Sequence, residues 1–127
     1  MLITKDVDIR KRLHQLVLPQ YARSGAFIVD ELGLNYGANR VDVAVIGRYL
    51  MGFEIKSSQD NLKRLRAQFD EYSKSLQRVY LVCAENHFQE ASEMLPPWVG
   101  SIKVVEGRGG IVKFEKVQTA RTSPLFE

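Results

Sequence analysis

Two carboxylates and an ammonium group recur in the sequence at a spacing that suits chemistry on phosphate esters. Asp42 lies in an alternating run of β-branched residues, and Glu54 and Lys56 follow it after eleven intervening residues. Because side chains alternate between the faces of a strand, Glu54 and Lys56 share one face at about 7 Å from each other. A hairpin that turns near Gly47 and Arg48 brings Asp42 beside them.

Such a group favours a divalent cation. Two carboxylates at short range repel each other unless a cation joins them, and hard oxygen ligands suit Mg²⁺ or Mn²⁺. Mg²⁺ keeps several waters and binds phosphate oxygens, and the Lys56 ammonium could hold the attacking water or balance the transition-state charge. The alternative is a structural one without function, in which a charged residue at every second position marks the solvent face of an amphipathic strand.

Hydrophobic spacing predicts the elements that must position these residues. The pattern predicts a helix over residues 6–18, strands over 26–32, 41–46 and 50–56, a helix that begins at the capping signal of 57–60 and continues to residue 76, a strand over 78–84, a helix over 88–95, and strands over 101–105 and 111–117. This order predicts an α/β domain over residues 1–118 with a mixed central sheet flanked by helices, and a loose tail over 119–127.

The helix after the hairpin carries a second polar group. Asp60, Arg64, Gln68 and Tyr72 follow one another at intervals of four residues, which places them along one side of a helix. An ion pair and a core tyrosine would account for most of this row. A functional interpretation is that the row helps Lys56 to orient water and contacts backbone phosphates.

Composition limits the other classes of function. The chain has 127 residues, 45% of them hydrophobic and 26% charged, which is typical of a globular domain. A single cysteine, Cys83, and two separated histidines give no internal disulfide and no structural zinc site. No apolar run approaches the roughly 20 residues of a membrane span, and the first residues do not match a secretion signal, so we expect a cytoplasmic protein. The net charge of +3 permits a polyanionic partner.

Taken in order, these residues resemble the PD-(D/E)XK nuclease superfamily, and more closely a small bacterial and phage branch of it. The matching segments are Arg40-Val41-Asp42, Glu54-Ile55-Lys56-Ser57, Asp60-x-Leu62-x-Arg64-Leu65, Gln68-x-x-x-Tyr72 and Leu95-Pro96-x-Trp98-x-Gly100. The resemblance extends from the first helix to about Ile102, and Val41 stands where the superfamily name has proline.

The resemblance implies a restriction-endonuclease-like αβββαβ core whose central hairpin binds one or two Mg²⁺ or Mn²⁺ ions. Asp42 and Glu54, with the backbone carbonyl of Ile55, would be the metal ligands. Lys56 would position the hydrolytic water.

Two more residues receive roles from the same resemblance. Gln68 would match an auxiliary glutamine, and Glu31, ahead of Asp30, would supply a further acid at the end of the first strand.

The predicted function is metal-dependent hydrolysis of a nucleic acid phosphodiester by in-line water attack, with DNA as the favoured substrate. The residues predicted to contact nucleic acid are Arg40, Arg48, Lys63, Arg64, Arg66 and Tyr72. Because the chain is small for gripping a duplex, a homodimer or a larger partner protein is expected. Two alternatives stay open: a non-catalytic nucleic-acid-binding or scaffold domain of the same fold, and an RNA nuclease.

Overall fold

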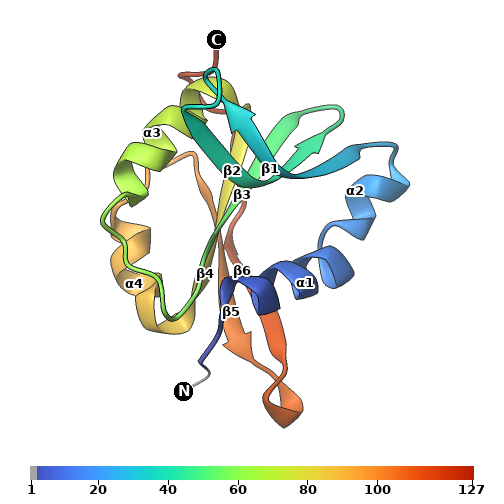
Figure 1. Ribbon diagram of the computed structural model, residues 1–127, viewed down its shortest axis with the longest axis vertical. Coiled ribbons are helices and arrows are strands. Elements are labelled where there is room, and N and C mark those ends of the chain that lie inside the picture. The colour runs from blue at the N-terminus through green and yellow to red at the C-terminus, as the bar shows by residue number, and fades with distance from the viewer. Residues whose placement is uncertain (1–2) are drawn as a thin grey trace.

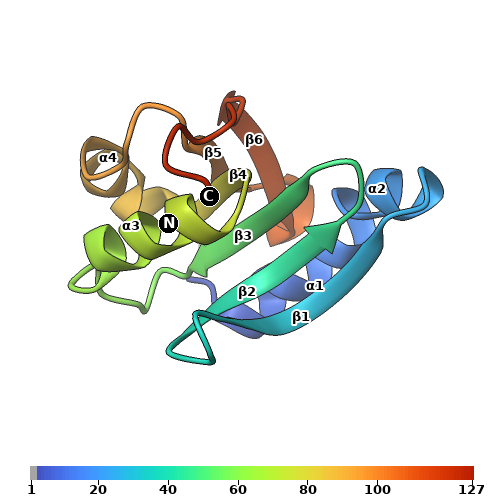
Figure 2. The ribbon, with the colours of Figure 1, turned by 90° about the horizontal axis from the view of Figure 1, so that it is seen from above.

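The computed structural model describes residues 3–127, so the first two residues of the predicted 1–118 domain lie outside it. A six-stranded mixed sheet forms the centre of the molecule, with helices on both faces (Figures 1 and 2). The helices are α1 (Asp6–Leu16), α2 (Pro19–Arg23), α3 (Leu65–Ser75) and α4 (Glu85–Glu93), and a short 3-10 helix spans Arg108–Gly110. The strands are β1 (Phe27–Leu34), β2 (Asn39–Ile46), β3 (Leu50–Lys56), β4 (Arg78–Ala84), β5 (Gly100–Glu106) and β6 (Val112–Gln118).

The strands lie in the sheet in the order in which they occur in the chain. β1, β2 and β3 form an antiparallel meander, β4 and β5 run parallel to β3, and β6 returns antiparallel to β5. The two parallel connections contain α3 and α4, which lie on the sheet face opposite α1 and α2 (Figure 2). The predicted mixed sheet flanked by helices is therefore confirmed. No helix within residues 3–127 is long and apolar enough to cross a membrane.

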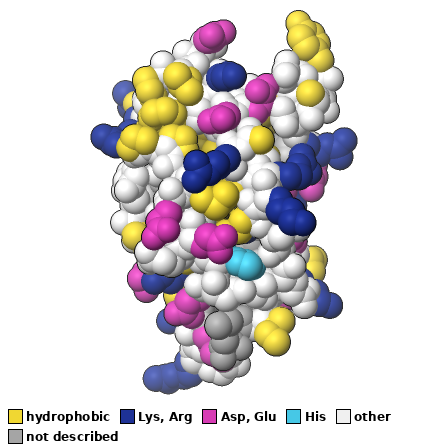
Figure 3. Space-filling view, turned by 90° about the vertical axis from the view of Figure 1, so that its left-hand side faces the viewer, with side chains coloured by type: hydrophobic (Ala, Val, Ile, Leu, Met, Phe, Trp, Pro, Cys, Tyr) yellow, Lys and Arg dark blue, Asp and Glu magenta, His cyan; other side chains and the backbone are white. Residues whose placement is uncertain are grey.

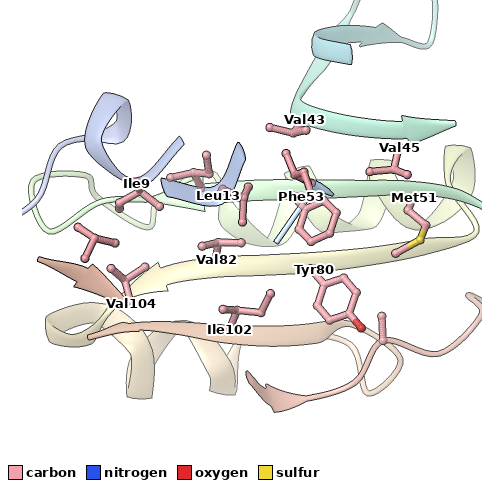
Figure 4. Close-up of a cluster of buried hydrophobic side chains, with 14 residues drawn as sticks. Ile9, Leu13, Val43, Val45, Met51, Phe53, Tyr80, Val82, Ile102 and Val104 are labelled. Atoms are coloured by element: carbon pink, nitrogen blue, oxygen red, sulfur yellow. The ribbon is translucent and has the colours of Figure 1, made fainter. Parts of the chain in front are cut away.

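Each face of the sheet has its own hydrophobic core. On the α1 side, Phe53 of β3 stacks on Tyr80 of β4 with ring centroids 5.2 Å apart (Figure 4). On the other side, Phe69 and Tyr72 of α3 pack among the buried residues of the second cluster. Because β3 is covered on both faces, its polar residue Glu54 is only 3% exposed.

The helix α3 begins later in the chain than predicted, because side chains before it hydrogen-bond to the local backbone. The predicted capping contact forms, with the Ser57 amide donating to Asp60 Oδ2 at 2.7 Å, and Asn61 Oδ1 then accepts from the Lys63 amide at 3.1 Å. Such local bonds compete with the helical ones, and the helix begins only at Leu65. The predicted helix start at 57–60 is therefore wrong, and Asp60 lies outside the helix.

The last nine residues pack against the body of the protein, unlike the loose tail that their polarity predicts. The Arg121 amide donates to the Trp98 carbonyl at 2.8 Å, and the Ser123 hydroxyl donates to the Ser73 carbonyl at 2.7 Å. Trp98 itself donates through its indole nitrogen to the Ser73 hydroxyl at 2.9 Å. The tail is held because its polar groups find backbone partners beside α3.

Candidate functional site

The residues that the sequence analysis selected do converge in space. We call the group of Glu31, Asp42 and Glu54, with the cations Arg10 and Lys56, the carboxylate cluster. Asp42 lies at the end of the β2–β3 pairing that is far from the hairpin turn. It directly precedes Val43, which pairs with Phe53. Its Oδ2 accepts the Ile55 amide at 2.7 Å and so replaces a ladder hydrogen bond.

Arg10 of α1 closes one side of the carboxylate cluster. Its Nη1 donates to the Asp42 carbonyl at 2.9 Å, and its Nη2 lies 3.1 Å from Glu31 Oε1 and 3.4 Å from Asp42 Oδ1. Its Nε donates to Asp6 Oδ1 at 3.2 Å. One guanidinium therefore contacts three carboxylates, and its residue was not among those predicted from the sequence.

Glu54 forms the other side and is held by residues of β3 and α3. Its Oε1 accepts the Tyr72 hydroxyl at 2.9 Å, and its Oε2 accepts Gln68 Nε2 at 3.3 Å and lies 3.6 Å from Lys56 Nζ. Gln68 thus has a partner for its amide nitrogen, whereas its buried Oε1 has no hydrogen bond within residues 3–127. Of the predicted row, Gln68 and Tyr72 bond the buried Glu54 carboxylate, whereas Asp60 and Arg64 lie outside α3.

Burial dominates the electrostatics of this cluster. It raises the pKa of Glu54, and the nearby Asp42 charge raises that pKa further, while Lys56 opposes the shift. Burial also raises the pKa of Asp42, which the Ile55 amide and Arg10 partly offset. Desolvation and the Glu54 charge raise the pKa of Tyr72, so its hydroxyl stays a hydrogen-bond donor.

The carboxylate cluster does not fit a divalent cation. The oxygens of Asp42 and Glu54 already accept N–H and O–H donors, and two protein cations neutralise them. Within residues 3–127, no group of three or more histidine, cysteine, aspartate or glutamate side chains has an arrangement that could hold a metal ion. The predicted ligand set of Asp42, Glu54 and the Ile55 carbonyl is therefore not supported by the donors around it.

Glu31 has an unusual backbone for a strand residue. Its φ is 56°, in the left-handed region that glycine favours, although its neighbours Asp30 and Leu32 pair regularly with β2. Its side chain contacts Arg10, while Asp30 Oδ1 lies 2.9 Å from His14 Nε2. Of the two acids, Glu31 is the one that joins the cluster.

The basic residues predicted to contact nucleic acid do not form one surface. Arg40 lies near the start of β2, whereas Arg48 lies in the turn beyond its other end; β2 itself has eight residues, or about 25 Å of extended strand. Lys63, Arg64 and Arg66 lie at the start of α3. On the side of the molecule that α3 and α4 cover, lysine and arginine side chains are mixed with acidic ones (Figure 3).

The structure contains a pocket that the sequence analysis did not predict. It has a volume of about 350 Å³ and lies at the turn between β2 and β3. We call it the tyrosine pocket, and its lining residues are Tyr21, Ser24, Ala26, Val45, Gly47, Arg48, Tyr49, Met51, Arg78, Tyr80, Lys116 and Thr119. Three tyrosines and three cations line it, and none of these lining residues is acidic.

Cations lie over aromatic rings in this pocket. The Arg78 guanidinium is 3.7 Å from the centroid of the Tyr49 ring, and that of Arg48 is 5.7 Å from the same centroid. Lys116 Nζ is 5.7 Å from the Tyr80 ring. Weak signals were present in the sequence, since Arg48 is followed by Tyr49, and Arg78 and Tyr80 share a strand face. The pocket draws on segments far apart in the chain, which explains why spacing did not reveal it.

Fold and site together define a mixed α/β protein whose carboxylates are neutralised by its own cations. Comparison with known proteins identifies the family. The family model for bacteriophage P4 protein cII matches residues 11–127. Protein cII of Enterobacteria phage P4 is 28% identical over 119 residues, which cover 94% of this chain and 45% of that relative. The chain belongs to the bacteriophage P4 protein cII family, and it spans less than half the length of this relative.

These findings correct the functional prediction. The resemblance to PD-(D/E)XK nucleases is wrong, because the family model and the curated relative both point to the protein cII family. The predictions of a metal-dependent nuclease, a hydrolase and a metal-binding enzyme are wrong for the same reason. The hydrolytic roles given to Asp42, Glu54, Lys56, Gln68 and Glu31 rested on that resemblance and are withdrawn, whereas the phage origin of the predicted branch agrees with the family.

Proposed function

We propose that this chain is a non-catalytic nucleic-acid-binding domain and that the tyrosine pocket is its binding site. The observation that carries the proposal is the convergence of three cations and three tyrosines in one pocket whose lining has no acid. Cationic side chains supply the phosphate contacts that dominate nucleic acid affinity, and aromatic rings supply stacking surfaces.

The charges in the pocket are available to a ligand. No ion pair within residues 3–127 involves Arg48, Arg78 or Lys116. Arg48 and Lys116 are exposed, so their charges are accessible to phosphates. The acids of the carboxylate cluster are paired with Arg10 and Lys56. A polyanion at the pocket therefore meets attraction from the pocket and little repulsion from the cluster.

The architecture permits a separate proposal about the fold alone. The element order from α1 through the β1–β3 meander to α3 and β4 agrees with a restriction-endonuclease-like αβββαβ core, apart from the added α2. We propose this relationship as one of architecture, without the hydrolytic chemistry.

Binding of a labelled oligonucleotide, followed by fluorescence anisotropy, tests the proposed function. Affinity should fall steeply between about 50 and 200 mM salt, because phosphate contacts release counterions. Arg48→Ala and Lys116→Ala should each weaken binding and lower the slope of log affinity against log salt by about 1. Arg66→Ala removes the same charge from the exposed surface of α3 and serves as the matched control.

Two results would contradict the proposal. The first is an absence of measurable binding at low salt by the wild-type protein. The second is an equal loss of affinity in Arg66→Ala and Arg48→Ala, which would mean that general surface charge, not the pocket, holds the polyanion.

A further inference from the structure

The shape of the tyrosine pocket selects among forms of nucleic acid. Its volume of about 350 Å³ lies at the lower end of the range for pockets that enclose a small ligand. A duplex keeps its bases stacked inside and presents mainly phosphates and groove edges to a protein surface. A single strand can turn one base outward and place it in such a recess.

The Arg78–Tyr49 pair is the stacking surface of the pocket, and the Tyr80 ring beside it is buried, with 4% of the residue exposed. Arg78 and Tyr49 already form a stacked pair at 3.7 Å, and guanidinium planes and tyrosine rings are the surfaces on which unpaired bases stack. The Tyr80 ring is fixed from behind by Phe53, at 9° between the ring planes. Gly100 is required beside it, because a side chain at that position would collide with the Tyr80 ring.

The exposed cations of the pocket come from separate segments. Arg48 belongs to the turn between β2 and β3, and Lys116 belongs to β6. Each lies 5.7 Å from the ring of a pocket tyrosine, Arg48 over Tyr49 and Lys116 over Tyr80. This arrangement gives positive charge beside the aromatic surfaces, where the phosphates that flank an inserted base would lie.

We infer that the tyrosine pocket receives one unpaired base of a single-stranded nucleic acid, with the flanking phosphates on Arg48 and Lys116. The inference rests on the proposed function and narrows its substrate class. In this arrangement the base stacks on the Arg78–Tyr49 pair, which lies in the pocket before any ligand binds.

Three probes of equal length test this inference with the unaltered protein. They are a single strand, the duplex of the same sequence, and a single strand from which all bases are removed but all phosphates kept. We expect the single strand to bind at least about fivefold more tightly than the abasic strand, since stacking contributes about 1–3 kcal/mol per base. We expect the duplex to bind more weakly than the single strand as well.

Variants of Tyr49 link the effect to the pocket. Tyr49→Leu removes the ring and should lower affinity for the single strand by about tenfold, with little change for the abasic strand. Tyr49→Phe keeps the ring and should retain the preference for the single strand. Urea denaturation of both variants checks that the fold is intact, and the abasic probe tests the inference with the wild-type protein if Tyr49→Leu fails to fold.

The possible results separate the inference from the proposed function. Equal affinity for all three probes, with loss of binding in Arg48→Ala, would overturn base insertion but leave nucleic acid binding in place. Failure of the wild-type protein to bind any of the probes would overturn both. Tighter binding of the intact single strand than of the abasic strand or the duplex supports both base insertion and nucleic acid binding, provided that Tyr49→Leu loses this preference.

Discussion

The carboxylate cluster and the tyrosine pocket both contain charged side chains but use them in opposite ways. In the cluster, Arg10 contacts Glu31 and Asp42, and Lys56 lies 3.6 Å from Glu54. In the pocket, Arg48, Arg78 and Lys116 face tyrosine rings, and no carboxylate lines the cavity. The cations of the cluster pair with its carboxylates, whereas those of the pocket have no ion-pair partner within residues 3–127.

This difference separates polar groups that stabilise the fold from those that recognise a partner. A buried charge must be paired and hydrogen-bonded, and once it is, little of its binding capacity is left. A cation in an open pocket without an acid keeps its attraction for anions. The type and spacing of Asp42, Glu54 and Lys56 suggested chemistry, but in the structure each of them contacts other charged or polar groups of the protein.

Replacement of Arg10 should break the cluster and give the largest effect. Arg10→Met keeps much of the aliphatic length but leaves Glu31, Asp42 and Asp6 without their shared cation. The Arg10 and Asp42 side chains are 18% and 16% exposed, whereas Asp6 and Glu31 are almost half-exposed. Loss of hydrogen bonds to a partly buried charged group costs about 1.5–3 kcal/mol, so the free energy of unfolding in urea should fall by about 2 kcal/mol. Folded Arg10→Met should bind an oligonucleotide as tightly as the wild type, because Arg10 does not line the pocket.

Lys11→Met provides the matched control for this experiment. Lys11 is the next residue of α1, is exposed, and takes part in no ion pair within residues 3–127. Its replacement should change stability by less than about 0.5 kcal/mol. Equal stability of Arg10→Met and Lys11→Met would show that Arg10 does not hold the cluster together.

Local patterns predicted much of the fold. The strands over 50–56 and 78–84 match β3 and β4 residue for residue, because each is a run of apolar or alternating residues bounded by turn signals. The start of α3 was not predictable in the same way, since Ser57 and Asp60 do form a capping contact that no helix follows. The five-residue helix α2 was missed because Pro19 signals the end of one helix and the first residue of another equally well.

The sites were harder to predict because their partners come from distant segments. Alternation on β3 placed Glu54 and Lys56 together, as the structure shows. Nothing at short range indicated that Arg10, 32 residues before Asp42, would reach it. The tyrosine pocket needed even more distant partners, since Tyr21 and Lys116 lie near opposite ends of the chain. Spacing therefore revealed the cluster but neither its cation nor the pocket.

The pH dependence of stability tests the burial of Glu54 in the carboxylate cluster. A carboxyl whose pKa is higher in the folded state than its ordinary value of 4.5 binds its proton more tightly when folded. Stability from this group is therefore complete below pH 4.5 and is lost as the pH rises through the raised pKa. Glu54→Gln removes this titration. The free energy of unfolding of the variant, measured relative to that of the wild type, should therefore rise by more than about 1 kcal/mol from acidic to alkaline pH.

Urea denaturation over that pH range measures this effect, and Glu90→Gln makes the same change on the exposed surface of α4 as a control. Some pH dependence should remain in Glu54→Gln, because burial raises the pKa of Asp42 too. Parallel pH profiles for wild type and Glu54→Gln would mean that Glu54 does not carry the burial penalty that its position implies.

The smallest expected effect concerns the backbone of Glu31. Its left-handed φ of 56° costs a residue with a Cβ about 1 kcal/mol or more, which glycine avoids. Glu31→Gly and Glu31→Ala both lose the half-exposed contact with Arg10, worth less than about 1 kcal/mol, so their difference isolates the backbone term. Glu31→Gly should be the more stable variant by about 1 kcal/mol in urea denaturation. A less stable Glu31→Gly would show that β1 is regular at this residue and that the contact with Arg10 imposes no strain on the backbone.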